Sequence, residues 1–125
     1  MATPKQAKVR ASHNFLSNLD TIAEFLLEIE PHEASARFDT LRREIDELIG
    51  LLEAHPAIGR PARFLASRSI QARERASRVG RLAQSLGMQE LREYVLKDYV
   101  VLYANSSSEV VLLALKHQRQ LQYRI

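Results

Sequence analysis

The first half of the chain contains two stretches in which apolar residues recur with the period of an amphipathic helix. In the first stretch, the apolar positions are Phe15, Leu16, Leu19, Ile22, Ala23, Leu26 and Leu27. Ser12 and Asn14 are both suited to cap this helix at its N-terminus. Pro31 ends the helix, and proline is also suited to the first turn of the helix that follows.

The second helical stretch has the clearest periodicity in the sequence. Its apolar positions alternate in steps of four and three, and they are Ala34, Phe38, Leu41, Ile45, Leu48 and Leu52. Charged residues fill the opposite face, and His55-Pro56 ends the helix. Because the link between the two helices is short, we expect an antiparallel helical hairpin whose apolar stripes pack on a common sheet.

The pattern changes from helix to strand after residue 90. Three segments rich in Val, Leu and Tyr are Leu91–Leu96, Tyr99–Asn105 and Val110–Lys116. Short links join them, which predicts a three-stranded antiparallel meander. Apolar residues occupy odd and even positions alike, so both faces of the meander are apolar. One face is expected to meet the helices, and the other is either a ligand-facing concave surface or is covered by a partner chain.

Two weaker elements complete the predicted fold. Residues 5–11 are a candidate strand before the first helix, and residues 68–86 are a candidate third helix that Gly87 would end. The prediction is a single α+β domain over residues 1–125. Its order is an N-terminal strand, a helical hairpin, an extra helix and a three-stranded antiparallel meander.

The charge is divided unevenly along the chain, although its net value is only +3. Residues 12–54 hold ten acidic residues and three arginines, whereas residues 56–89 hold seven arginines and one glutamate. A basic segment of this kind can meet nucleic acid or an acidic protein, or it can be a solvated helix face.

Composition and spacing exclude several classes of site. The chain has no cysteine, and His13, His32 and His55 lack the spacing of a metal site, so neither a metal nor a cofactor is expected. The N-terminal residues lack the apolar segment of a secretory signal, and no apolar run could span a bilayer. We therefore expect a cytoplasmic protein without membrane contact.

Three further motifs follow the hairpin in a characteristic order. They are HPAIGRPAR (55–63), ELREYVLKDYVVLYA (90–104) and EVVLLALKHQR (109–119). Together with the hairpin they resemble the RelE/ParE toxin superfamily of bacterial type II toxin–antitoxin, or plasmid stabilisation, systems. The segment 64–87 is longer than the connection usual there and is predicted to be an atypical helical insertion. The resemblance implies a cognate antitoxin as partner.

The superfamily has two functional branches. RelE-like members cut messenger RNA in the ribosome, whereas ParE-like members poison DNA gyrase without chemistry of their own. The positions at which RelE-like proteins carry lysines and an arginine appear here as Leu91, Glu93 and Val100. A valine cannot stabilise a phosphorane. The sequence is therefore closer to the ParE branch, with the RelE-like ribonuclease and an inactive member that still binds antitoxin as alternatives.

The candidate site residues divide by partner. The residues expected to bind the target are Arg92, His117, Arg119, Tyr123 and Arg124. If the chain were a ribonuclease, its catalytic residues would be Arg92, His117 and Arg119. The residues expected to attract the antitoxin are Arg73, Arg78 and Arg81. The tyrosines of the meander, Tyr94, Tyr99 and Tyr103, either stack on a nucleobase or pack within the sheet.

Overall fold

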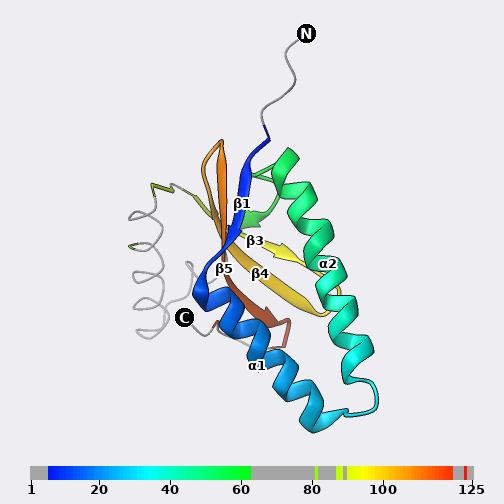
Figure 1. Ribbon diagram of the computed structural model, residues 1–125. Helices are drawn as coiled ribbons and strands as arrows, with labels where there is room; N and C mark the ends of the chain where they lie inside the picture. The colour runs from blue at the N-terminus through cyan, green and yellow to red at the C-terminus, as the bar shows by residue number, and fades with distance from the viewer. Residues whose placement is uncertain (1–5, 63–80, 82–86, 89, 120–122, 124–125) are drawn as a thin grey trace.

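A five-stranded sheet and a helical hairpin make up the fold (Figure 1). The computed structural model describes residues 6–62, 81, 87–88, 90–119 and 123. The strands lie in the order β1-β5-β4-β3-β2. The elements are β1 (Lys8–Ala11), α1 (His13–Ile29), α2 (Ala34–Ala54), β2 (Arg60–Pro61), β3 (Glu90–Val95), β4 (Tyr99–Asn105) and β5 (Glu109–His117).

The predicted helical hairpin and N-terminal strand are confirmed. Ser12 is the N-cap of α1, because its hydroxyl oxygen accepts the backbone N–H of Phe15 at 3.1 Å, and Asn14 lies within the first turn. The expectation that Pro31 sits in the first turn of the second helix is wrong. α2 begins at Ala34, and Pro31 lies in the turn that joins the two helices.

The predicted meander is confirmed as β3, β4 and β5, but it is only part of a mixed sheet. β1 pairs with β5 in parallel, and the two-residue β2 pairs with β3 in antiparallel register, with Arg60 opposite Glu93. The predicted helix of residues 68–86 lies outside the described residues, apart from Arg81. Gly87 has a φ of +74°, a left-handed conformation that favours glycine.

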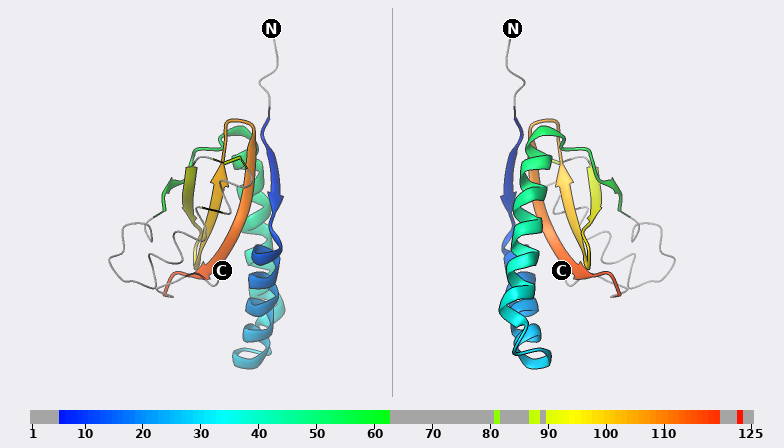
Figure 2. Two further views of the ribbon diagram at one scale, coloured as in Figure 1. Left: turned by 90° about the vertical axis from the view of Figure 1, so that its left-hand side faces the viewer. Right: turned by 90° about the vertical axis from the view of Figure 1, so that its right-hand side faces the viewer.

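The helix-side face of the sheet packs against the hairpin, and Figure 2 shows both helices on the same side of the sheet. Phe15 and Leu41 supply large buried side chains from the helices, and Val101, Tyr103 and Leu112 supply them from the strands. This cluster is the main core. It anchors both helices at fixed positions relative to β4 and β5.

The second face of the sheet is also buried, and this corrects the sequence-based expectation. We expected this face to bind a ligand or to be covered by a partner chain. Instead the chain buries it, because side chains from three distant parts of the sequence, Ala62, Met88 and Tyr123, join one apolar cluster with the strands. The strand residues of this cluster are Val100, Leu102, Ala104, Val111, Leu113 and Ala114.

Candidate functional site

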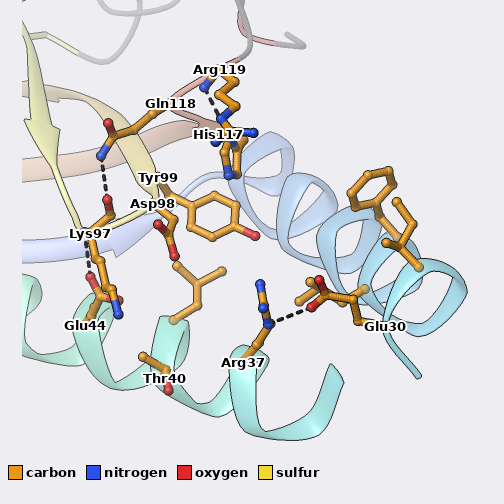
Figure 3. Close-up of a pocket in the computed structure, with 14 residues that line it drawn as sticks. Glu30, Arg37, Thr40, Glu44, Lys97, Asp98, Tyr99, His117, Gln118 and Arg119 are labelled. Atoms are coloured by element: carbon orange, nitrogen blue, oxygen red, sulfur yellow. Dashed lines mark hydrogen bonds and ion pairs between the residues drawn. The ribbon is translucent and has the colours of Figure 1, made fainter. Parts of the chain in front are cut away.

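An open groove lies where the linked ends of the two helices face the β3–β4 turn and the end of β5 (Figure 3). It consists of two hollows of about 670 and 580 Å³. Both hollows are lined by Phe25 of α1, Tyr99 of β4, His117 of β5 and Arg119 just after it. Because these four residues are shared, we treat the two hollows as one site, the hairpin groove.

The helical wall of the hairpin groove is apolar. Phe25 and Ile29 lie four residues apart on α1, and each side chain is 57% exposed. Leu26 and Leu41 also line the larger hollow, and both are buried. Large apolar side chains that remain exposed in a concave surface are typical of a site that binds an apolar partner group.

The sheet wall carries an edge-to-face pair of rings. Tyr99 and His117 are ladder partners on β4 and β5, and their ring centroids lie 5.3 Å apart at 78°. Burial raises the pKa of Tyr99, and the nearby Asp98 raises it further, so the phenol stays neutral. The Nδ1 atom of His117 accepts the backbone N–H of Arg119 at 3.1 Å, which fixes the orientation of the imidazole.

A cation lies on the opposite side of the hairpin groove. Arg37 of α2 forms ion pairs with Glu30 at 2.6 Å and with Glu33 at 3.3 Å (Figure 3 shows the pair with Glu30). More than half of the Arg37 side chain is exposed. The pairs therefore orient the guanidinium without removing it from solvent, and they add little to stability.

The β3–β4 turn, which closes one end of the hairpin groove, is tied to two other elements. A side-chain oxygen of Glu44 on α2 accepts the backbone N–H of Lys97 at 3.0 Å. Gln118, which follows β5, donates its side-chain amide to the carbonyl oxygens of Leu96 at 2.9 Å and Lys97 at 2.7 Å. Because helix, turn and tail are joined by these bonds, the wall that holds Tyr99 is preorganised.

The predicted target-binding residues do not gather on one surface. His117 and Arg119 line the hairpin groove, and Arg119 is exposed. Arg92 was expected to lie beside them, and this is wrong: it pairs with Tyr103, four residues along β4 from Tyr99. There its guanidinium donates to Glu90 at 2.7 Å and to the carbonyl of Gly59 at 2.8 Å. The hydrogen bond from Arg92 and its positive charge hold the pKa of Glu90 below its usual value.

Tyr123 lies on the second face, away from the hairpin groove, and is only 2% exposed. Its hydroxyl donates to Glu93, a carboxylate that is 3% exposed and lies 3.8 Å from the Nε atom of Arg60. Burial, followed by the bond to Glu93, raises the pKa of Tyr123 far above its ordinary value. A side chain buried in this way does not fit the expected role of an exposed interface contact.

The remaining predicted residues can be placed only in part. Arg73, Arg78 and Arg124 lie outside the described residues, while Arg81 is described and exposed. Tyr103 is fully buried, and its hydroxyl oxygen accepts the backbone N–H of Gly59 at 2.8 Å. Tyr94 packs on the helix-side core. For these two tyrosines packing within the sheet, not base stacking, is the observed role.

Phe25, Ile29 and Arg37 were not singled out from the sequence. Phe25 falls outside the main apolar stripe of its helix, and Ile29 lies beyond Leu27, where the predicted stripe ended. A lone exposed apolar residue carries no functional signal. Among the described residues, no group of three acidic, histidine or cysteine side chains could hold a metal ion. Within the same part of the chain, no helix has the length and apolar character needed to cross a membrane.

Comparison with known proteins was made at the level of sequence and of fold. Residues 9–122 match the family described as "ParE toxin of type II toxin-antitoxin system, parDE". No curated protein matches the chain by sequence. Among solved structures, a chain from "Chromosomal ParDE TA system from P. aeruginosa" is similar in fold, with a TM-score of 0.55 and 12% identity. That similarity covers 91% of this chain and 98% of the other.

Proposed function

The chain belongs to the ParE toxin family of type II toxin–antitoxin systems, and from this premise we propose that it inhibits DNA gyrase by binding rather than by cutting RNA. The observation that carries the proposal is the burial of the second face of the sheet. Val100 lies on this face and is buried. By the resemblance, RelE-like nucleases carry an arginine at this position. A messenger RNA could not reach this position in the folded chain.

The separation of the charged residues supports the same choice. A ribonuclease that uses the 2′-hydroxyl needs its base, its acid and its phosphate-binding cation around one phosphate. Arg92 and His117 lie toward opposite ends of β4, and Arg92 is held by Glu90 and Gly59. This separation supports the proposal that Arg92, His117 and Arg119 do not act together as a catalytic set.

We propose that the hairpin groove is the surface that binds the antitoxin. Its apolar wall of Phe25 and Ile29 suits the apolar face of a segment that orders on binding. Exposed Arg119 and the guanidinium of Arg37 would meet acidic residues of that segment. The same exposed Arg119, with His117, is the surface proposed for gyrase, so an antitoxin seated in the groove would block the target directly.

One preparation tested in two assays decides between the branches. We expect the purified chain to inhibit supercoiling by purified gyrase, and we expect a translating extract to show no codon-specific cleavage of messenger RNA. Arg119→Glu should abolish gyrase inhibition in a protein that remains folded, while Arg42→Glu, on an exposed helix position outside the groove, serves as the matched control. Cleavage of translated messenger with gyrase unaffected would refute the proposal.

Two growth experiments test the toxin–antitoxin pairing. Induction of the chain alone should arrest a bacterial host, and co-expression of the neighbouring small gene should restore growth. Normal growth with folded protein present would instead favour an inactive member that only binds antitoxin. Charge reversal of Arg73, Arg78 and Arg81 should slow antitoxin association at low salt, and an unchanged rate would remove this basic segment from the interface.

A further inference from the structure

β5, the strand that carries His117, has one extra residue relative to its neighbour β4 at one position in their pairing. Leu102 pairs with Ala114 and Tyr103 pairs with Leu112, so Leu113 has no partner of its own on β4. This is a β-bulge, and it changes which side chains face which side of the sheet.

The bulge reverses the alternation of β5. Val110 and Leu112 face the helices, while Leu113 and Ala114 both join the cluster on the second face. After the bulge Leu115 faces the helices again, and His117 meets Tyr99 on that side. Strict alternation from Leu112 would have turned both Leu115 and His117 to the second face. The extra residue is thus the reason that His117 enters the hairpin groove.

Side chains at the start of α1 hold the backbone at the bulge. The side-chain amide of Asn14 donates to the carbonyl oxygen of Leu113 at 2.9 Å, and the Ser12 hydroxyl donates to it at 3.3 Å. The amide oxygen of Asn18 accepts the backbone N–H of Leu115 at 3.0 Å. Asn18 is 9% exposed, so an apolar residue there would leave the N–H of Leu115 buried without that acceptor.

We propose that Asn14 and Asn18 are positioning residues, which select the bulged register of β5 and thereby place His117 in the hairpin groove. Asn18 lies three residues after Phe15, on the apolar side of α1 where an apolar residue would otherwise add to the core. The expected effect of Asn18 on binding rests on the proposed function, in which the hairpin groove binds the antitoxin. Its role in register is independent of that assignment.

The test uses the full chain and two readouts. In Asn18→Leu, which keeps the number and branching of the side-chain heavy atoms but removes the acceptor, we expect the nuclear Overhauser contact between the Tyr99 and His117 rings to disappear. The Leu115 amide should exchange with solvent about tenfold faster or more, since its acceptor is lost. Affinity for the antitoxin that restores growth on co-expression should fall about tenfold.

Two variants separate register from stability. Asn18→Asp keeps an acceptor oxygen and should retain the ring contact, even if the protein is less stable. Leu48→Ala removes a fully buried side chain from the helix-side core away from the bulge, and it should retain the ring contact as well. Loss of the contact in Leu48→Ala at comparable stability would show that the contact reports only general stability, and it would overturn the proposal.

The outcomes for Asn18→Leu are distinct. An unchanged ring contact in the folded variant overturns the proposal. A lost ring contact with unchanged antitoxin affinity supports the positioning role and refutes the hairpin groove as the antitoxin site. If Asn18→Leu does not fold, Asn14→Ala provides the test, since Asn14 is only half-buried. There the ring contact should weaken and affinity should fall severalfold, and an unchanged contact again overturns the proposal.

Discussion

Replacing Gly59 with alanine should destabilise the protein by about 3 kcal/mol, and the reason is the close packing around one turn. A Cβ atom added at Gly59 would lie 2.7 Å from the carbonyl oxygen of Glu93 and 2.7 Å from the hydroxyl oxygen of Tyr103. Neither group can easily give way, because one is sheet backbone and the other belongs to a fully buried ring.

The magnitude combines two effects. Overpacking of a close-packed site costs about 1–3 kcal/mol. A shift of the turn would also break the bond from the Gly59 N–H to Tyr103, and an unsatisfied buried partner costs a further 1–3 kcal/mol or so. For a chain of this size, a loss of about 3 kcal/mol lowers the melting temperature by on the order of 10 °C.

Gly50 provides a matched control with the opposite sign. It lies within α2, is exposed, and a Cβ atom added there would meet nothing within 4 Å. Gly50→Ala should therefore stabilise the protein by about 0.5–1 kcal/mol through helix propensity. Urea denaturation of both variants measures the difference. A cost below about 0.5 kcal/mol for Gly59→Ala would refute the close packing described for this turn.

Three further predictions use the same denaturation and binding measurements. Ser12→Ala should lower the free energy of unfolding by about 1–2 kcal/mol, because the N-cap bond to Phe15 is lost; an unchanged midpoint would contradict the capping role. Since the pKa of Tyr123 is raised in the folded chain, its stabilising contribution is complete below the ordinary value of about 10 and is lost as pH rises above it. In Tyr123→Phe, the free energy of unfolding should fall less steeply above about pH 10, by about 1.4 kcal/mol per pH unit. Equal pH slopes of the free energy of unfolding in the two proteins would argue against the burial of Tyr123. Phe25→Ser should leave stability within about 0.5 kcal/mol, because the ring is mostly exposed, but should weaken antitoxin binding at least tenfold; full affinity would exclude it from the interface.

Periodicity was sufficient to predict the helical hairpin and the meander, because each depends on residues near one another in sequence. It could not predict how the second face of the sheet is covered. Met88 precedes β3 and Tyr123 follows β5, so both lie outside the strands, and the period of a strand does not specify that such residues pack back onto the sheet. The apolar residues at odd and even positions were read correctly as a two-sided sheet, but the chain itself covers the second side.

The candidate site was predicted only where a side chain could be judged from its own strand. His117 and Arg119 were chosen from the end of the last strand, and they do line the hairpin groove. Arg92 was misplaced because its position relative to His117 depends on strand register across β4. One available signal was overlooked: Asn18 is a polar residue on the apolar stripe of a helix, and such a residue commonly has a specific buried partner.

The two faces of the sheet support the proposal that this chain acts by binding its target rather than by cutting RNA. On the second face, Glu93 is buried among apolar side chains, and such a carboxylate is costly unless it is paired. Tyr123 and Arg60 pair with it, which ties Tyr123 and β2 to β3. A face closed in this way has no room for a substrate, so the proposed function places recognition on the helix side. There the bulge at Leu113 turns Leu115 and His117 toward the groove, whereas strict alternation would have turned both to the second face.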